Sequence, residues 1–441
     1  MHTETKTQST CPELFDWQKS HAIKLADSIA KFGYAKDGSD TGTGKTVVAL
    51  SVAKALGLAP FVVCPKSVVP SWKDWMARFE LPNFVFNYEK LVRGTTEYYK
   101  RKGSQRFWTL HPERVLLIFD EDHRCKGSKS ENAKMMIAAK NRGMSTLSLG
   151  ATSCANPIEM RALGFLLDMH DDRGWWNWCL KNGCRRGTFG GLQFVGNKSA
   201  LKRIHDHIYK EGRGSRLKIT DLPPGSFPDG VIIPEGYDVG STKEIEEIYH
   251  DLWVKLEDIE LKKEEAENAL TVQLRARQEV ELLKVPVLEE LARDALDADN
   301  SVVIFVNFRD TLEALLRRLS GSHEISIIEG SQSGVTRDRE VKRFQNDESR
   351  ICLCMTQAGG TGLSLHDEHG KHPRVSLISP SFSAIDLKQA LGRIHRAGAK
   401  SPAVQKIIFA DNTVEMRVCR LVRKKLNNID LINDDEMNPL L

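Results

Sequence analysis

Short apolar segments recur along this chain, and polar, glycine or proline residues bound each of them. Because they lack a polar residue at every second position, they are typical of strands that are buried on both faces of a parallel sheet. Stretches with helical spacing lie between them. One covers residues 47–56, and Gly57 directly after it is a signal for the end of a helix. The clearest predicted strands are residues 61–64, 115–119, 302–306, 351–355 and 375–378. Buried strands that alternate with helices predict an α/β fold.

The pattern changes near the middle of the chain. Residues 222–230 are dense in proline and glycine and are interpreted as a loop or linker. Pro286 suits the first turn of a helix over residues 287–296, and strand signals resume at Val302. Between the linker and this helix, one apolar stripe with helical spacing runs through Ile245, Ile248, Leu252, Leu256 and Ile259.

A chain of 441 residues has room for two or three domains. We predict two α/β domains, over residues 1–230 and 231–441, and the second begins with the helical stretch, over 241–297. Apolar residues make up 41% of the chain and charged residues 28%. These fractions are ordinary for a globular protein, and they exclude a collagen-like or wholly disordered chain.

The compartment is predicted from what the sequence lacks. No apolar segment approaches the roughly 18 residues that span a membrane, and residues 1–12 lack the apolar core of a signal peptide. The nine cysteines are scattered without a Cys-x-x-Cys pair. This spacing argues against a disulfide framework or zinc ribbon and favours reduced thiols in an intracellular protein.

The net charge is only +4, but its distribution is uneven. Residues 175–218 hold ten Lys or Arg against two Asp or Glu, whereas residues 241–270 hold ten Asp or Glu against four Lys. The basic segment is a candidate phosphate-binding surface, and the alternative is an ordinary solvated face.

The first chemical motif is Ser39-Asp-Thr-Gly-Thr-Gly-Lys-Thr46. Small residues let backbone N–H groups wrap phosphate oxygens, while Lys45 reaches the β and γ phosphates and the Thr46 hydroxyl binds Mg²⁺. Ser39 replaces the first glycine of the usual pattern, and residues 32–35 are the available preceding strand. The predicted ATP-binding residues of this loop are Gly42, Thr43, Gly44, Lys45 and Thr46.

The second motif is an acidic box, in which the strand over 115–119 ends at Asp120-Glu-Asp-His123. Ligands bind at the carboxyl edge of parallel sheets, where this strand would present Asp120 and Glu121. We expect Asp120 to hold Mg²⁺, Glu121 to orient or deprotonate the attacking water, and His123 to couple the site to neighbouring loops. Asp122 has no predicted role, and the alternative for the whole box is a solvated turn.

The second domain carries two further motifs. Thr356-Gln-Ala-Gly-Gly-Thr-Gly-Leu363 follows a predicted strand and would let backbone approach phosphate. In residues 389–396, a helix would place Gln389, Arg393 and Arg396 on one face. Two arginines there would suit the negative charge that spreads over a transferring γ-phosphoryl group. The alternative is a solvated basic helix.

In this order, the motifs resemble those of superfamily-two helicases and translocases, within the Swi/Snf-like branch. Phe15-Asp-Trp-Gln18 resembles the adenine-reading segment, with Gln18 as the reader. The resemblance also covers motifs Ia (63–72), Ib (87–91), II (120–130), III (149–156), IV (303–308), V (356–363) and VI (389–396), and a short signature at 412–415. The departures from the Swi/Snf pattern are Asp122, Ser153 and Ser364.

The resemblance implies two tandem RecA-like lobes with parallel sheets and an ATP cleft between them. ATP and Mg²⁺ would be the cofactors. The catalytic residues would be Lys45, Asp120, Glu121, His123, Gln389, Arg393 and Arg396, with Thr46 and Asp120 as the metal ligands and Gln18 and Gly362 as further ATP contacts. By the same resemblance, DNA would contact Lys66, Ser67, Asn87, Thr356 and Gly360.

Residues 174–186 form an unusual segment with three tryptophans in four positions and a pair of arginines. Trp175 and Trp176 could stack on the bases of an opened junction, and Arg185 and Arg186 could hold phosphates. We therefore interpret residues 174–218 as a branch-sensing element. The alternative is that the tryptophans pack under the first lobe.

The leading functional hypothesis is an ATP-dependent DNA helicase or translocase that remodels or unwinds forks and junctions, as in branch migration, during replication, recombination or repair. Its expected partners are branched or forked DNA and recombination or replication proteins, with no membrane. We expect a monomer in the cytoplasm of a prokaryotic or phage-infected cell. The alternatives are an RNA helicase, the motor subunit of a nuclease or restriction assembly, and a scaffold with a degenerate ATP site.

Overall fold

The structure is a computed structural model. It describes residues 14–103, 105–187, 191–262, 266–321, 323–359, 363–381 and 383–411, together with 413, 415, 426, 428, 429, 432 and 433, and the side chains of 256–270 are outside it. The chain divides into two compact units. The first comprises Met1–Pro224 with Asn427–Met437, and the second is built on Gly225–Leu426. The return of the C-terminal segment to the first unit was not predicted.

The first unit is built on a six-stranded, fully parallel sheet in the order β10-β1-β7-β6-β2-β3. Its strands are β1 (Tyr34–Asp37), β2 (Ala59–Cys64), β3 (Phe84–Asn87), β6 (Val115–Asp120), β7 (Ser145–Leu149) and β10 (Gly214–Ser215). The predicted strands over 61–64 and 115–119 are confirmed as β2 and β6. The strand before the phosphate loop starts at Tyr34, and not at residue 32, because Phe32 ends a helix that Gly33 caps with φ +79°.

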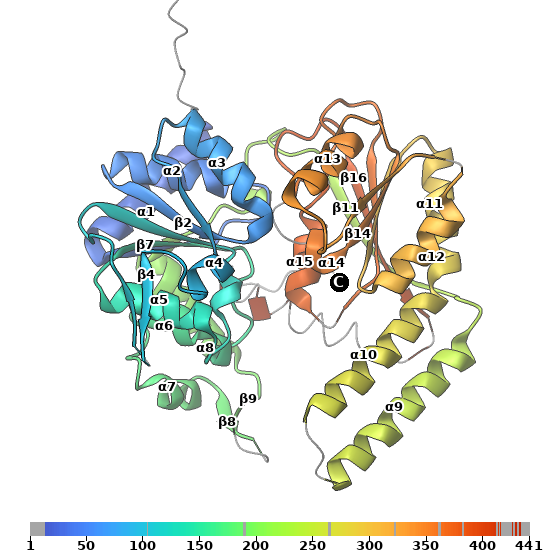
Figure 1. The fold of residues 1–441 in the computed structure, drawn as a ribbon, viewed down its shortest axis with the longest axis horizontal. Coiled ribbons are helices and arrows are strands. Elements are labelled where there is room, and N and C mark those ends of the chain that lie inside the picture. The colour runs from blue at the N-terminus through green and yellow to red at the C-terminus, as the bar shows by residue number, and fades with distance from the viewer. Residues whose placement is uncertain are drawn as a thin grey trace, which may run out of the picture. The chain divides into compact units, whose positions relative to one another are not determined.

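Helices cover both faces of this sheet (Figure 1). On one face, α1 (Asp16–Phe32), α2 (Lys45–Ala55) and α3 (Val69–Arg78) bury a core of Ala, Val, Leu and Ile. On the other face lie α4 (Tyr88–Val92), α5 (Glu131–Asn141), α6 (Arg161–Leu166) and α8 (Lys198–His205). Helix α7 (Trp175–Lys181) follows α6 in the chain. The short helical turns are η1 (Lys66–Val68), η2 (Asp122–Cys125), η3 (Pro157–Met160), η4 (Asp206–Lys210) and η5 (Ile219–Asp221).

Two antiparallel hairpins also belong to the first unit. One joins β4 (Tyr99–Lys102) to β5 (Gln105–Trp108), and the other joins β8 (Cys184–Arg186) to β9 (Leu192–Phe194). Neither was predicted from the sequence, because each strand is only three or four residues long.

The second unit has its own six-stranded parallel sheet, in the order β11-β16-β15-β12-β14-β13. Its strands are β11 (Gly230–Tyr237), β12 (Ser301–Val306), β13 (Ile325–Ile328), β14 (Ile351–Met355), β15 (Arg374–Ile378) and β16 (Ala403–Ala410). The predicted strands over 302–306, 351–355 and 375–378 are confirmed. The helices beside this sheet are α11 (Val285–Asp297), α12 (Arg309–Leu319), α13 (Gly334–Gln345), α14 (Thr356–Gly359) and α15 (Ala384–Leu391) (Figure 1).

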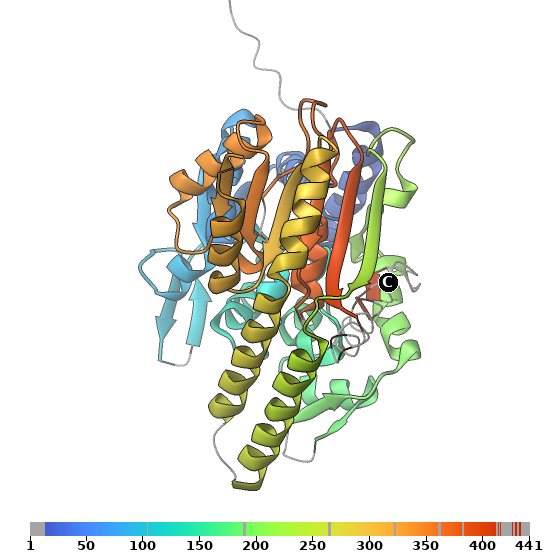
Figure 2. The same cartoon turned by 90° about the vertical axis from the view of Figure 1, so that its right-hand side faces the viewer.

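The predicted helical stretch of the second unit forms two long helices and α11. Helices α9 (Thr242–Lys262) and α10 (Ala266–Leu283) run side by side and project from the unit (Figures 1 and 2). Ile245 and Leu252 of the predicted stripe are buried, whereas the side chains of Leu256 and Ile259 lie outside the described residues. Pro286 lies in the first turn of α11, as predicted.

Two expectations about compartment bear on the described residues. Within that part of the chain, no helix combines the length and apolar character that a bilayer crossing requires. The seven cysteines that the structure describes are buried free thiols, and Cys11 and Cys419 lie outside it.

Candidate ATPase site

The phosphate loop joins β1 to α2 and depends on two glycines. Gly42 and Gly44 adopt φ values of +89° and +82°, which favour glycine. A Cβ at Gly44 would also lie 2.5 Å from Nε2 of Gln18. Helix α2 begins at Lys45, so its free N–H groups and positive dipole end face the loop.

Lys45 is folded back onto this loop. Its Nζ donates to the carbonyl oxygens of Ser39 and Asp40, both at 2.9 Å. Burial lowers the pKa of Lys45, while the nearby carboxylates of Asp37, Glu121 and Asp120 oppose that shift. The fold therefore brings the lysine of the loop close to Asp120 and Glu121 of the acidic box.

Asp120 ends β6 in a half-buried position. Burial and the charge of Glu121 raise its pKa to about 6. Its oxygens accept from Nε1 of Trp72 at 2.8 Å and from the backbone N–H of Glu121 at 3.0 Å. Glu121 has φ +52°, an uncommon conformation for a residue with a side chain, and its Oε2 lies 3.3 Å from Nδ1 of His123. His123 thus contacts the carboxylate of Glu121, two residues before it in the chain.

Asp122 forms a buried ion pair that the sequence did not reveal. Its Oδ2 lies 2.8 Å from Nζ of Lys36, and each side chain is 1% exposed. The Ser148 hydroxyl donates to the same oxygen. Lys36 also donates to the carbonyl oxygens of Asp37 at 3.1 Å and Gly150 at 2.8 Å. These contacts join the strand before the phosphate loop, the acidic box and motif III.

A segment from the far end of the first unit braces the phosphate loop. This segment, residues 214–219, is here called the strap. Ser215 and Leu217 of the strap accept from the backbone N–H groups of Gly38 at 3.0 Å and Asp40 at 2.9 Å. Arg216 donates to the carbonyl oxygen of Gly38 and forms an ion pair with Asp40 at 2.9 Å.

The strap alters one expectation about the basic residues of 174–218. Arg216 is committed to the phosphate loop, and Arg213 donates to the Tyr34 hydroxyl at 3.2 Å and pairs with Glu211. These two arginines are therefore positioned by internal contacts, because β10 adds to the edge of the sheet beside β1.

A second buried network lies beneath the strap. Asp37 lies 3.3 Å from Nε2 of His21 and accepts from the backbone N–H of Ser39 at 2.9 Å. Although burial alone would raise the pKa of Asp37, the proximity of His21 and Lys45 holds it below its usual range. Ser39, which replaces a glycine of the usual pattern, thus connects the loop to α1 through its hydroxyl and His21 at 3.1 Å.

Gln18 lies against the phosphate loop. Its Nε2 donates to the Thr43 carbonyl at 2.9 Å, and its Oε1 accepts from the Phe15 backbone N–H at 3.0 Å. In this arrangement the carboxamide positions the loop. Its role as the reader of adenine stays a prediction.

The predicted nucleic-acid contacts of the first unit lie along the carboxyl edge of its sheet. Lys66 is exposed and Ser67 is half-buried in η1, which follows β2. Asn87 ends β3 and donates to Glu89 at 2.8 Å. Since Cys64 pairs with Asn87 in the sheet, these contacts share one edge with Asp120.

In residues 174–186 the tryptophan side chains are partly packed, whereas the two arginines are exposed. Trp175 and Trp176 of α7 are half-buried, and the guanidinium of Arg161 lies 5.9 Å from the ring of Trp175. Trp178 packs against the core of the first unit and lies 5.1 Å from the ring of His170. Arg185 and Arg186 of β8 are exposed.

In the second unit, the predicted contacts of motif V are only partly described. Thr356 is buried, and its hydroxyl donates to the Val306 carbonyl at 3.0 Å. That hydroxyl therefore connects the first residue of α14 to the end of β12, and it is not presented to a ligand in this structure. Gly360 and Gly362 lie outside the described residues.

The helical geometry predicted for motif VI is wrong. Helix α15 ends at Leu391 with Gly392 as its C-cap, so Arg393 and Arg396 lie in the turns beyond it, and Gln389 is buried in the helix. Arg393 is fully buried and donates to the Leu363 carbonyl at 3.1 Å. Arg396 donates to the Ser364 hydroxyl at 2.7 Å. Ser364, one of the departures from the Swi/Snf pattern, thus provides one of the contacts between motifs V and VI.

The donor set of the first unit fits Mg²⁺ and ATP. The Asp120 carboxylate and the Thr46 hydroxyl, both half-buried, are hard oxygen ligands of the kind that Mg²⁺ takes alongside phosphates. Among the described residues, no group of three or more His, Cys, Asp or Glu could hold a metal ion by itself. The donor set therefore suits a Mg²⁺ ion that takes further oxygen ligands from phosphates.

Comparisons with known proteins agree with this geometry. The family description "Helicase conserved C-terminal domain" matches residues 284–398. The chain is 32% identical over 464 residues to a protein of Acanthamoeba polyphaga mimivirus named as a proposed ATP-dependent RNA helicase, covering 98% of this chain and 86% of the relative. It is 22% identical over 466 residues to a CHD3-type chromatin-remodeling factor of Arabidopsis thaliana, covering 93% of this chain but 36% of the relative.

Two further comparisons are more distant. A RAD54-like DNA repair and recombination protein of Drosophila erecta is 28% identical over 151 residues, or 33% of this chain and 19% of the relative. The SWI2/SNF2 ATPase core of Sulfolobus solfataricus, solved with double-stranded DNA, covers 96% of this chain and 93% of its own at 16% identity. The TM-score of this match is 0.37, so the structural similarity is too low to support a conclusion about fold or function. The mimivirus match extends over nearly the whole chain and shows that the chain is an ATP-dependent helicase. Together with the matches to the CHD3-type and RAD54-like proteins and the two parallel-sheet RecA-like lobes, it assigns this chain to the Swi/Snf-like branch of the superfamily-two helicases.

Proposed function

We propose that this chain is an ATP-dependent DNA translocase that remodels branched DNA such as forks and junctions. One observation carries the proposal: Lys45, Asp120 and Glu121 meet at the carboxyl edge of one parallel sheet. Lys66 and Asn87 follow β2 and β3 of the same sheet and lie at that edge. The nucleotide site and the nucleic-acid contact would thus lie on one rigid sheet. A change at the nucleotide during hydrolysis could then be passed to the bound nucleic acid.

ATP and Mg²⁺, when bound, supply the phosphoanhydride bond and the charge that neutralises its oxygens. Lys45 would exchange the carbonyl oxygens of Ser39 and Asp40 for phosphate oxygens. Thr46 and Asp120 would hold Mg²⁺. Glu121, held by His123, would orient the attacking water and accept its proton.

We propose Gln389, Arg393 and Arg396 of the second unit as further catalytic residues. Arginine side chains stabilise the charge that develops on a transferring phosphoryl group and can contribute about 10³–10⁵ in rate. Because Arg393 and Arg396 contact Leu363 and Ser364, a change at motif V would be transmitted to them directly. We propose that nucleic acid at motif V acts through this contact.

Branched DNA is favoured by the exposed β8–β9 hairpin with Arg185 and Arg186, beside the half-buried Trp175 and Trp176. The names of the Arabidopsis and Drosophila relatives concern chromatin remodelling and DNA repair. RNA is the second candidate, because the mimivirus relative is named as an RNA helicase. A virus-infected cell is then the setting that this relative favours, and a monomer stays our expectation.

The test is ATP hydrolysis by the purified chain without nucleic acid and with single-stranded DNA, duplex DNA, a four-way DNA junction, or RNA. Lys45→Ala is the control, since it leaves the fold but removes the phosphate contact. Strongest stimulation by the junction, lost in Lys45→Ala, supports the proposal. Stimulation by RNA alone would transfer the protein to the RNA class, and hydrolysis that no nucleic acid alters would overturn both.

A further inference from the structure

We propose that the β4–β5 hairpin is an additional nucleic-acid contact of the first unit, which binds a single-stranded segment. In this contact, basic side chains hold backbone phosphates and the ring of Phe107 stacks on a base. The inference rests on the proposed function, because it identifies a further surface for the same nucleic acid.

The hairpin lies directly after a predicted nucleic-acid contact. Asn87 precedes α4, and residues 93–98 lead from α4 into β4. The base of the hairpin is anchored, because Tyr99 and Trp108 pair across it and are 2% and 1% exposed. Nε1 of Trp108 also donates to the Met135 carbonyl of α5 at 3.1 Å. The hairpin is therefore a fixed platform beside motif Ib.

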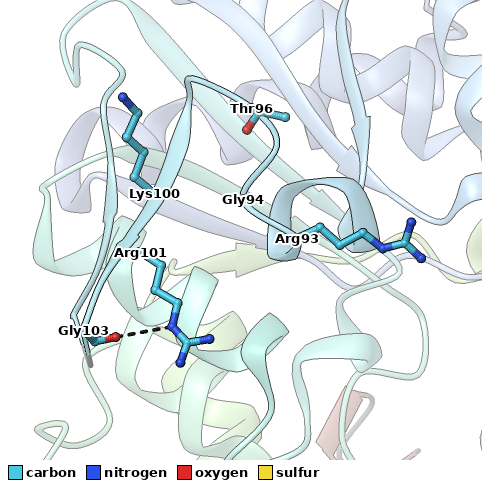
Figure 3. A pocket seen from close by; sticks show the side chains of 6 residues that line it. All are labelled: Arg93, Gly94, Thr96, Lys100, Arg101 and Gly103. Carbon is cyan, nitrogen blue, oxygen red and sulfur yellow. Dashed lines mark hydrogen bonds between the residues drawn. The ribbon is translucent and has the colours of Figure 1, made fainter.

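The exposed part of the hairpin is strongly basic. Lys100, Arg101 and Lys102 follow one another and are all exposed, as is Arg93 at the end of α4. In Figure 3, Lys100 and Arg101 leave β4 in different directions, and Arg93 extends from α4. With Gly94, Thr96 and Gly103, these three basic residues line a hollow of about 600 Å³.

Most of this positive charge is not neutralised by a neighbouring acid. Among the ion pairs of the described residues, Arg106 pairs with Glu131 at 2.8 Å, but none involves Arg93, Lys100 or Lys102. Glu97 is the one acidic residue between positions 93 and 102 of the sequence. Such a cluster binds polyanions by releasing the counterions that screen their phosphates.

Phe107 adds a feature that a solvated basic face does not need. It lies directly opposite Lys100 in the antiparallel register and is 38% exposed. Residues that face each other across a hairpin share one side of it, so an aromatic ring and a cation lie together. Proteins that bind single strands combine basic side chains on phosphates with aromatic rings under bases. A fully paired duplex would offer this surface its phosphates but not its bases.

The first test is a charge reversal, Lys100→Glu with Lys102→Glu. The matched control is Lys24→Glu with Lys31→Glu, two exposed lysines of α1 in the same unit. Binding of labelled single-stranded DNA and RNA oligonucleotides is measured by fluorescence anisotropy at several salt concentrations. We expect the hairpin variant to bind about tenfold more weakly, and the slope of log K against log salt to fall by about 1.4, as for two lost phosphate contacts.

The second test addresses the base. Phe107→Ala should weaken single-strand binding about tenfold and leave duplex binding unchanged, and Phe107→Trp should retain it. Equal affinities of the hairpin and control variants, at any level, would overturn the inference, as would an equal loss for single strands and duplex in Phe107→Ala. Stimulation of ATP hydrolysis by the wild-type protein is measured separately. A failure of the proposed function can therefore be distinguished from a failure of the inference about the hairpin. Unequal effects on DNA and RNA identify which of the two the hairpin prefers.

Discussion

At the scale of single residues, the buried charges of the first unit determine how its catalytic edge is held. Asp122, one of the departures from the Swi/Snf pattern, forms a buried ion pair with Lys36. A buried pair stabilises little by itself, since desolvation offsets most of the attraction. Its value lies in position, because Lys36 also donates to the carbonyl oxygens of Asp37 and Gly150. The pair thereby fixes three segments of the candidate site relative to one another.

The pair predicts strong coupling between two substitutions. Lys36→Met or Asp122→Ala alone should lower the free energy of unfolding by about 3–5 kcal/mol, because each leaves an uncompensated buried charge. The double variant should lose much less than the sum of the two. Urea unfolding of the four proteins measures the coupling, and additive losses would show that the two charges do not depend on each other.

Asp120 predicts an opposition between stability and activity. Its folded pKa of about 6 lies above the unfolded value of 3.8, so the folded state holds an extra proton between these values. Its contribution to stability therefore falls as pH rises from about 4 to 6. Without nucleotide, Asp120→Asn should be more stable than wild type at pH 7.5, by up to about 3 kcal/mol, with no gain near pH 4 and no ATP hydrolysis.

The control for this prediction is Asp16→Asn. Asp16 is fully exposed, and Lys19 holds its pKa below the usual value, so this change should not stabilise the protein at pH 7.5. Denaturant unfolding at pH 4, 5 and 7.5 separates the two variants. An Asp120→Asn protein that is no more stable than wild type at pH 7.5 would show that the carboxylate is well solvated or compensated.

At the scale of elements, the strap gives the phosphate loop its second support. One side of the loop rests on Gln18 of α1, and the other on Ser215, Arg216 and Leu217. The strap ends five residues before Pro224, where the first unit passes into the second. A movement of the chain at this junction would therefore be passed through residues 220–224 to the strap, and from Arg216 to Asp40. The loop is thus held by two elements that are distant in sequence.

Arg216→Ala should therefore raise the KM for ATP, by about tenfold, with a smaller change in kcat. The physical reason is that the loop loses its ion pair at Asp40 and a contact at Gly38, so part of the binding energy is used to order it. Arg213→Ala is the matched control, since Arg213 lies one residue before the strap but contacts Tyr34 and not the loop. Steady-state ATPase kinetics of both variants test the difference, and equal KM values would remove the strap from nucleotide binding.

At the scale of the whole molecule, the two units are not simple halves of the chain. The described residues 428, 429, 432 and 433 belong to the first unit. Ile432 is buried in its core, and Asn433 donates to the Ala151 carbonyl of motif III at 2.8 Å. His205 and Tyr209 also contact this segment. Ile432 and Asn433 therefore belong to the first unit, and a chain truncated near residue 224 would lack both of them.

Ile432→Ala should lower the free energy of unfolding by about 2–4 kcal/mol, because it leaves a cavity in the core of the first unit. Ile23→Ala is the control, because Ile23 is 61% exposed and should change stability by less than about 0.5 kcal/mol. Denaturant unfolding followed by tryptophan fluorescence measures both. Equal stabilities of the two variants would mean that the returning segment is not part of the folded core.

The sequence by itself determined the α/β class, five central strands, the two-lobe organisation and the motifs of the nucleotide site. These follow from local periodicity and from spacing within short segments, such as the glycines that precede Lys45 and the strand that ends at Asp120. Tertiary structure alone decided the partner of Asp122, the strap on the phosphate loop, the end of α15 before Arg393 and the return of Ile432. Apart from the end of α15, which the adjacent Gly392 caps, each of these depends on residues that are distant in sequence or on strands too short to show a period. The physical reason is that a buried charge or a short edge strand is stable only through neighbours that folding brings to it.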